Sequence, residues 1–308
     1  MPIKSRSPFF YVGDKYKLMP QIVRLFPSQI RHYYEPFVGG GSSALYVGVD
    51  SPLFNNAEEY HLNDIDRYII RLHQFIGGFA YKQQELLDRL FCLISEYGMT
   101  LSYNGITVSD ELKRQYAKTY FAQHNRSGFL RMRNDFNANK HDMLRLYTLL
   151  IYGFNHFLRF NLRGDFNLPV GNVDFNKNVY NALVSYLDFI RYNNVRYYCG
   201  DYKPFLQNAI FGEGDFVYLD PPYLISASEY NKFWSPIEEL FLLDVLDKLN
   251  VQDVKFAISN LITHKGQKNS IFAEWSKKYR IDEITSNYIS YHDNSIKDSQ
   301  EVLVRNYG

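Results

Sequence analysis

Short stretches typical of β-strands alternate with stretches typical of helices along most of this chain, and this order limits the folds open to it. The strand-like stretches cover residues 32–37, 59–64, 195–201, 215–220 and 254–260. The helix-like stretches cover residues 15–26, 42–48, 65–76, 178–191 and 236–250. Such alternation indicates βαβ units, so we expect an α/β fold with a doubly wound, mainly parallel sheet. Two last stretches, near residues 281–291 and 301–307, are expected to form a terminal antiparallel pair.

The alternation stops between residues 77 and 165, where the sequence is rich in Tyr, Phe, Asn, Arg and Lys and has helical periodicity. We therefore predict a helical domain at 77–165, inserted into one α/β domain built from residues 1–76 and 166–308. The loop at 161–172 contains two glycines and a proline, and it is expected to return the chain to the sheet.

Charge is unevenly distributed although the net charge is only +1. Residues 1–31 and residues 111–145 each carry a net charge of +5, so the rest of the chain is acidic. Two basic regions fit a polyanion laid across one face, and they equally fit two solvated helix surfaces.

The two cysteines, Cys92 and Cys199, have no spacing typical of a metal site. We therefore expect no metal, and a reduced, cytoplasmic environment. No apolar stretch approaches the length of a membrane span, and the start of the sequence lacks the apolar core of a secretory signal. We expect no membrane partner.

Four acidic residues stand where predicted strands end: Glu35, Asp64, Asp201 and Asp220. In doubly wound sheets, ligands bind just beyond the carboxyl ends of the strands. These four positions are therefore the first candidates for a binding site.

The first strand end reads EPFVGGGSSAL, from residue 35 to residue 45. Gly39, Gly40 and Gly41 would let a ligand approach the backbone closely, and Ser42 or Ser43 is expected to cap the next helix. The spacing is that of neither a dinucleotide-binding turn nor a phosphate-binding P-loop. A tight structural turn is the alternative interpretation.

The second and third strand ends carry Asp64 and the pair Asp201 and Tyr202. Asp64 is placed to bind ribose hydroxyls, with Asp66 as the less favoured candidate. A helix N-cap is an equally good explanation for Asp64. Asp201 could bind a polar ligand edge and Tyr202 could pack on a base, or both could simply form a turn.

The fourth strand end reads DPPY and comprises Asp220, Pro221, Pro222 and Tyr223. Two prolines cannot extend a β-ladder, so the strand must stop there, and they fix the local backbone. The Asp220 carboxylate and the Pro221 carbonyl would then accept the two hydrogens of an aromatic amine, while the Tyr223 ring stacks on the base. A plain Pro-Pro turn is the alternative.

Together these motifs resemble those of the Dam-type, alpha-group (D12 class) N6-adenine DNA methyltransferases. The resemblance rests on EPFVGGGSSAL and LDPPY, on YVGDKYKL at 11–18 and on GDFNLPVGN at 164–172. The order of the motifs is that of the family, and only the N-terminal motif departs, reading Gly13-Asp14-Lys15 where Gly-Gly-Lys is common. The resemblance implies a Rossmann-like methyltransferase fold that uses S-adenosyl-L-methionine, with a target-recognition domain at 77–165.

The resemblance also implies roles for individual residues. The cofactor-binding residues it implies are Tyr11, Lys15, Glu35, Pro36, Phe37, Gly39, Gly40, Gly41, Asp64, Asp201, Tyr202 and Asp220. Asp64 would hold the ribose of the cofactor, and Asp201 with Tyr202 its adenine. Asp220, Pro221, Pro222 and Tyr223 would hold the target adenine as the catalytic group.

A base within duplex DNA cannot reach such a site, so we expect the target adenine to be flipped out. Methyl transfer would be a direct displacement, to which the protein contributes orientation and electrostatics. The cytosine C5 route needs a nucleophilic cysteine after a proline, and neither cysteine has that setting.

For DNA recognition we expect residues whose side chains can contact base edges or phosphates. The candidates are Arg126, Arg131, Arg133, Asn134, Tyr230, Lys265 and Lys268. Each could instead contact only solvent. Asn125 or Phe129 is a further candidate, to fill the gap that the flipped base leaves.

The predicted function is therefore adenine N6-methylation of duplex DNA, by the modification enzyme of a restriction system or by a solitary enzyme. A restriction endonuclease acting on the same site is an expected partner. The alternatives are methylation of an amino group in RNA or protein, and a DNA-binding protein without catalysis. A nicotinamide dehydrogenase is disfavoured by the glycine spacing.

Overall fold

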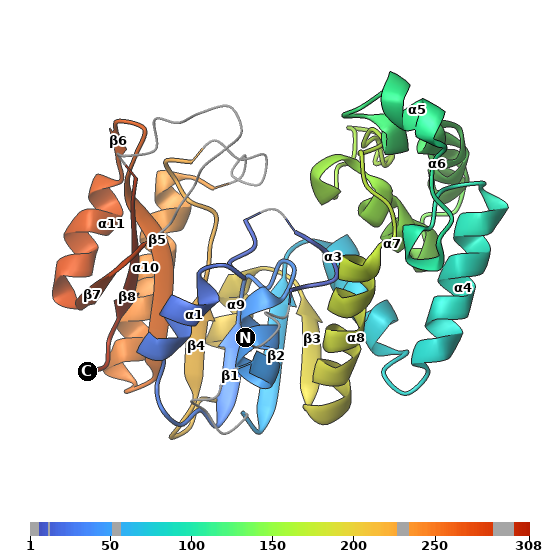
Figure 1. The fold of residues 1–308 in the computed structure, drawn as a ribbon. Helices are drawn as coiled ribbons and strands as arrows, with labels where there is room; N and C mark the ends of the chain where they lie inside the picture. Colours follow the sequence, from blue (N-terminus) through green and yellow to red (C-terminus); the bar gives the residue numbers. More distant parts are fainter. Residues whose placement is uncertain (1–5, 12, 51–56, 227–233, 286–298) are drawn as a thin grey trace. The chain divides into compact units, whose positions relative to one another are not determined.

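The computed structural model of the protein describes residues 6–11, 13–50, 57–226, 234–285 and 299–308. The chain divides into two compact units, neither of which is continuous in sequence. The sheet unit comprises Lys15–Val38, Ser51–Ile65 and Asn193–Gly308, and the helical unit comprises Met1–Asp14, Gly39–Asp50 and Asp66–Tyr192. Figure 1 shows the order of the helices and strands along the chain.

The sheet unit contains one mixed sheet in which the strands follow the order β3-β2-β1-β4-β5-β8-β7, with the short β6 paired to β5. The strands are β1 His32–Glu35, β2 Glu59–Asp64, β3 Val195–Cys199, β4 Phe216–Leu219, β5 Lys255–His264, β6 Gln267–Lys268, β7 Arg280–Ile284 and β8 Gln300–Arg305. The five strands β1 to β5 run parallel to one another. The expected α/β, doubly wound fold is confirmed.

The terminal antiparallel pair is confirmed as well, although residues 286–291 of its first predicted stretch lie outside the described residues. β8 runs antiparallel to both β5 and β7 and lies between them. The chain order reverses at β1, since β2 and β3 lie to one side of it and β4 and β5 to the other. Ligands of doubly wound sheets bind at such a switch point.

The helices of the sheet unit are α1 Met19–Ile22, η1 Val23–Leu25, α9 Tyr202–Gln207, α10 Pro236–Val251, α11 Ser270–Trp275 and η6 Ser276–Lys278. Alternate residues of β4 point to opposite faces of the sheet. Val217 and Leu219 join the apolar core that α9, α10 and α11 cover, whereas Phe216 and Tyr218 pack against Phe26. All four residues of β4 are buried, as expected for a central strand of a doubly wound sheet.

The helical unit contains α2 Ser42–Leu45, η2 Tyr46–Asp50, α3 Arg67–Gly77, α4 Gln83–Glu96, η3 Ser102–Asn104, α5 Asp110–Gln115, α6 Tyr120–Ala138, α7 Met143–Tyr152, η4 Phe154–His156 and α8 Lys177–Tyr192. α7 is its central helix: it packs against α3, α4 and α6, and eight of its residues are buried. Residues 77–165 lie within this unit, and the assignment of DNA recognition to them stays a prediction. No helix in the described ranges has the length and apolarity that crossing a membrane requires.

Candidate active site

The predicted acids end their strands or closely follow them. Glu35 is the last residue of β1 and Asp64 the last residue of β2, while Asp220 comes one residue after β4. Asp201 is separated from β3 by Gly200 and is the N-cap of α9. Because these strands are parallel neighbours, their carboxyl ends meet at one edge of the sheet.

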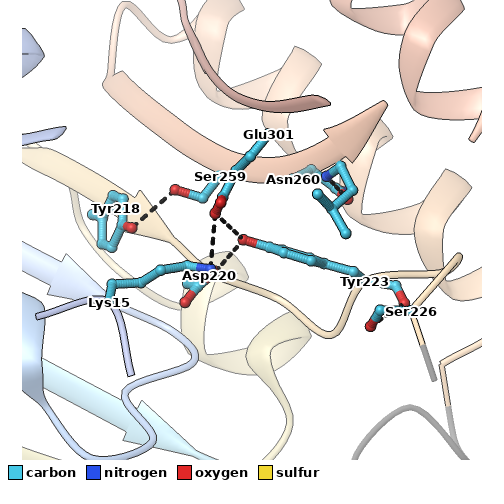
Figure 2. Close-up of polar contacts among 9 residues, drawn as sticks. Lys15, Tyr218, Asp220, Tyr223, Ser226, Ser259, Asn260 and Glu301 are labelled. Atoms are coloured by element: carbon cyan, nitrogen blue, oxygen red, sulfur yellow. Dashed lines mark hydrogen bonds and ion pairs between the residues drawn. The ribbon is translucent and has the colours of Figure 1, made fainter. Parts of the chain in front are cut away.

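A cluster of charged and polar side chains surrounds the Asp220 carboxylate (Figure 2). We call it the Lys15 cluster. It comprises Lys15, Asp220, Tyr223 and Glu301. The Lys15 ammonium lies 3.0 Å from Glu301 Oε1 and 3.5 Å from Asp220 Oδ1. The Tyr223 hydroxyl donates to Asp220 Oδ1 at 2.8 Å and lies 3.3 Å from Glu301 Oε1. Since a phenol has one proton, the shorter contact takes it.

The pKa of the Asp220 carboxyl is set by opposing influences. Burial raises the pKa of its carboxyl above the ordinary range, and the Glu301 charge acts in the same direction. The Lys15 ammonium and the Tyr223 hydroxyl lower that pKa. Lys15 and Tyr223 therefore favour the ionised form, in which both carboxylate oxygens are able to accept hydrogen bonds.

The Tyr223 ring is largely covered in this structure. It is 9% exposed, and the Lys15 ammonium lies 4.6 Å from the centre of the ring. Tyr223 thus makes a hydrogen bond to Asp220 and a cation–π contact with the Lys15 ammonium. The stacking of Tyr223 on a target base stays a prediction.

The strand that leads to Asp220 is fixed from its buried side. The Tyr218 hydroxyl and the Ser259 hydroxyl lie 2.9 Å apart, which connects β4 to β5 (Figure 2). β4 ends at Leu219, directly before the Asp-Pro-Pro segment, as expected from the two prolines. Asp220 therefore follows a strand that its neighbours hold rigidly.

Asn63 was not predicted, although it connects two of the loops at this edge. Its side-chain amide donates to the carbonyls of Pro36 and Gly200, both at 3.0 Å, and its backbone carbonyl accepts from the Val38 amide. The side chain is buried. Asn63 thus connects the segments that follow β1 and β3. A polar residue beside Asp64 in an otherwise strand-like stretch was the only signal for it.

Asp201 caps a helix and Tyr202 is buried, while the predicted binding of a ligand by this pair stays a prediction. One Asp201 oxygen accepts from the Lys203 amide at 2.9 Å, so Asp201 caps α9. Tyr202 is buried, with its ring centre 5.1 Å from that of Phe37. Burial raises the pKa of the Tyr202 hydroxyl, and the nearby Glu238 raises it further.

Asp64 and Asp66 are now distinguished. Asp66 is the N-cap of α3 and accepts from the Tyr68 amide at 2.8 Å. The alternative interpretation, that Asp64 caps this helix, is therefore wrong. Asp64 stands instead at the end of β2, in register with Cys199 of β3.

The glycine turn of the helical unit is packed too closely for side chains. A Cβ on Gly40 would lie 2.8 Å from the Tyr11 Cβ, and one on Gly39, whose φ is +46°, would lie 3.1 Å from the Tyr11 ring. Ser7 donates to the Gly40 carbonyl. The helix that follows begins at Ser42 with Gly41 as its N-cap, so the expected capping by Ser42 or Ser43 is wrong.

His73 holds the same turn by a bond to its backbone. His73 Nε2 lies 2.8 Å from the Gly39 carbonyl, and His73 Nδ1 contacts the Tyr186 hydroxyl. A carbonyl only accepts, so Nε2 carries the proton and Nδ1 of the neutral ring accepts from Tyr186. His73 is fully buried, which lowers its pKa to about 4.

Comparison with known proteins decides the family. Residues 11–290 match the model of the D12 class N6 adenine-specific DNA methyltransferases. This chain belongs to that family. The match extends across most of the chain and includes every strand-end motif described above.

Relatives of this D12-class chain include named modification enzymes. It is 34% identical to the type II methyltransferase M.FokI of Planomicrobium okeanokoites and 30% identical to the modification methylase StsI of Streptococcus sanguinis, each over 98% of this chain. The chain spans only 43% of the length of each of these two relatives. It is 26% identical to the DNA adenine methylase of Escherichia coli strain K12, over 71% of this chain and 66% of that protein.

The candidates for DNA recognition fall into two groups in this D12-class chain. Arg131 donates to the Tyr97 carbonyl at 3.1 Å and Arg133 to the Leu168 carbonyl at 3.3 Å, so both already have bonds within the helical unit. Arg126 and Asn134 are exposed on α6. Their role in base reading stays a prediction.

Two further candidates on α6 are corrected. Asn125 and Phe129 are both 0% exposed, and the Asn125 side chain bonds the Thr100 amide and hydroxyl. They belong to the core of the helical unit, so neither is available to fill the gap left by a flipped base.

Lys265 and Lys268 are exposed around the turn between β5 and β6. Lys265 and Gly266 have φ values of +50° and +75°, as two-residue hairpin turns require. Tyr230 lies outside the described residues. Among the residues that the structure describes, no group of His, Cys, Asp and Glu could hold a metal ion.

Proposed function

We propose that this chain transfers a methyl group from S-adenosyl-L-methionine to the N6 amino group of an adenine in duplex DNA. The observation that carries the proposal is the Lys15 cluster: an acid at the end of β4, held by a lysine and a tyrosine. A family of adenine-specific DNA methyltransferases provides the reaction class, and the placement of Asp220 provides the group that can receive the amine.

The chain's own residues orient the amine. The Asp220 carboxylate and the Pro221 carbonyl are acceptors, and an exocyclic amine offers two hydrogens. Directed hydrogen bonds to both hydrogens leave the nitrogen lone pair pointing away from the protein groups, toward an electrophile. Lys15 lowers the pKa of Asp220 and so favours its ionised form, which is the stronger acceptor. The proton that the amine loses on methylation can pass to Asp220 or to water.

The residues present fit S-adenosyl-L-methionine, which when bound supplies an electrophilic methyl group on a positively charged sulfur. Acidic groups at the strand ends suit a ligand that carries positive charge. We assign Asp64 to the ribose and Asp201, Tyr202 and Phe37 to the adenine of the cofactor. The assignments of Tyr11 and the glycine turn, in the helical unit, rest on the sequence motif.

The DNA substrate carries further consequences. The target adenine must leave the helix to meet Asp220, and residues 77–165 are the proposed readers of the site. A restriction endonuclease of the same specificity is the proposed partner, because M.FokI and StsI are named type II and modification enzymes. We place the enzyme in the cytoplasm, where its DNA substrate lies.

Asp220→Ala tests the proposal. We expect no transfer of tritiated methyl groups to duplex DNA, with S-adenosyl-L-methionine binding retained in calorimetry. Asp244→Ala, a change at an acid that is 57% exposed and paired with Lys248 on the surface, is the control and should retain activity. Normal turnover by Asp220→Ala would refute the mechanism. Incorporation into RNA or protein but not DNA would refute the substrate, and a wild-type chain that binds no cofactor would refute the enzyme.

A further inference from the structure

Three aromatic side chains meet beside the carboxyl ends of β1 and β3, and one of them has no role in the proposals above. Phe37 lies in the segment after β1, Tyr202 begins the helix after β3, and Trp234 precedes Ser235, the N-cap of α10. The Trp234 ring centre lies 5.8 Å from that of Phe37 and 6.0 Å from that of Tyr202. Trp234 thus joins the pair already assigned to the adenine of the cofactor.

The three rings form a corner rather than a stack. Trp234 and Phe37 are nearly perpendicular, with an interplanar angle of 82°. Phe37 and Trp234 are both partly exposed, whereas Tyr202 is buried beneath them. A flat heterocycle can therefore stack on one ring while its edge meets the other.

A buried acid fixes the orientation of Trp234. The indole N–H donates to Glu239 Oε2 at 2.6 Å, and Glu239 is only 1% exposed. Glu239 Oε1 accepts from the side-chain amides of Asn260, at 3.2 Å, and Asn269, at 2.7 Å. Donors from β5 and from the segment before α11 therefore hold the carboxylate on both sides, and the carboxylate holds the indole.

We propose that Trp234 is a further wall of the site for the cofactor's adenine, and that Glu239 is the positioning residue that holds it there. The proposal rests on the proposed function. Asp201, next to Tyr202, can accept the hydrogens of the adenine amino group, since one of its two oxygens caps α9 and a carboxylate has two. An apolar corner beside such an acceptor suits a purine with an exocyclic amine.

Substitution at Trp234 gives the first test, by calorimetric titration with S-adenosyl-L-methionine. We expect Trp234→Ala to weaken binding about tenfold or more, the loss typical of one base-aromatic stack, and Trp234→Phe to weaken it less. In steady-state assays the KM for the cofactor should rise while kcat and the KM for DNA stay unchanged. A Trp234→Ala variant that binds the cofactor within about twofold of a binding-competent wild type would overturn this inference and leave the proposed function standing.

Glu239→Gln tests the positioning role. Both oxygens of Glu239 accept hydrogen bonds, one from the indole and one from the asparagine amides. In glutamine one oxygen is replaced by an NH2 group, which would face one of these donors and lose its hydrogen bond. We expect the KM for the cofactor to rise as in Trp234→Phe, with kcat unchanged. Glu274→Gln, at a carboxylate that is 76% exposed, is the control. A fall in kcat with an unchanged cofactor KM would contradict the role.

Tryptophan emission gives a readout that does not depend on activity. The sequence contains only two tryptophans, Trp234 and Trp275. Trp275 is buried and donates to Asp247 at 2.8 Å. In Trp275→Phe, saturation with S-adenosylhomocysteine should change the emission of the remaining indole. Unchanged emission at saturation would overturn the proposal, while a wild type that binds neither ligand would refute the proposed function instead.

Discussion

Lys15 lies closer to Glu301 than to Asp220, although Asp220 is the residue in the DPPY motif. The distances are 3.0 Å and 3.5 Å, and the side chains of Lys15 and Glu301 are 8% and 0% exposed. A buried pair of this kind stabilises little by itself, but removal of one partner leaves an uncompensated charge. The pair therefore places a cation beside Asp220 and keeps it there.

Lys15→Gln should change the pH dependence of methyl transfer. Burial raises the pKa of Asp220, and Lys15 is the strongest influence in the opposite direction. Without the ammonium, the carboxyl stays protonated up to a higher pH, so the acid limb of the kcat/KM profile should move to higher pH. We expect activity about tenfold lower at neutral pH, with recovery as the pH is raised. Lys17→Gln, at an exposed lysine, is the matched control. An acid limb that stays in place would contradict the assigned role.

Asn63→Asp should damage the strand-end loops. The change would aim carboxylate oxygens at the Pro36 and Gly200 carbonyls, which the amide now satisfies. We expect a loss of about 2–3 kcal/mol in the free energy of unfolding, measured with urea, and weaker binding of S-adenosyl-L-methionine. Asn178→Asp, at an exposed position in the first turn of α8, should change neither quantity. Equal stability of Asn63→Asp and wild type would show that these two bonds contribute little.

His73 should make the protein less stable in acid. Its folded pKa is about 4, below the ordinary value of 6.5, because burial disfavours the charged ring. The unfolded chain therefore binds the proton first, so stability falls as the pH drops from about 6.5 to about 4, by roughly 3 kcal/mol. His73→Gln should lack this component when unfolding is compared at pH 7 and pH 4. His124→Gln, at an exposed histidine, should retain it. The same pH dependence in His73→Gln would argue against a neutral, buried ring.

Arg126 and Arg131 should differ in what they contribute. Arg126 is exposed, whereas Arg131 donates to the Tyr97 carbonyl. If Arg126 contacts a phosphate, Arg126→Ala should weaken duplex binding and lower the salt slope of the logarithm of the affinity by about one, with unchanged stability. Arg131→Ala should lower stability by about 1 kcal/mol. Fluorescence anisotropy over a salt series and thermal unfolding measure the two effects. An unchanged salt slope in Arg126→Ala would remove Arg126 from the interface.

The sheet could be predicted because each strand is a short apolar stretch with a clear end. Asp220 directly precedes two prolines, and Glu35 precedes a glycine turn, so local chemistry marks both strand ends. Local chemistry also explains the errors. Asp64 and Asp66 are equivalent as N-caps in sequence, and only the start of α3 distinguishes them.

The partners of these residues could not be predicted, because they come from distant segments. Glu301 is 78 residues from Tyr223, and Asn260 and Asn269 reach Glu239 across 21 and 30 residues. In the sequence, Glu301 is an acid at the start of an apolar stretch and would be expected at the surface. In the fold it is buried. The burial of Asn125 could not be predicted either. A polar side chain is expected to be exposed, but its two hydrogen bonds to Thr100 allow Asn125 to be buried.

The position of β8 in the sheet has a consequence for the order of assembly during synthesis. Among the strands that the structure describes, β8 is made after β5 and β7, yet it pairs with β5 on one side and β7 on the other. β7 therefore leaves the ribosome before the strand that connects it to the sheet exists. Until Gln300–Arg305 have been made, β5 keeps an open edge and Lys15 has no Glu301. A nascent chain shorter than this carries the DPPY motif without the carboxylate that holds Lys15.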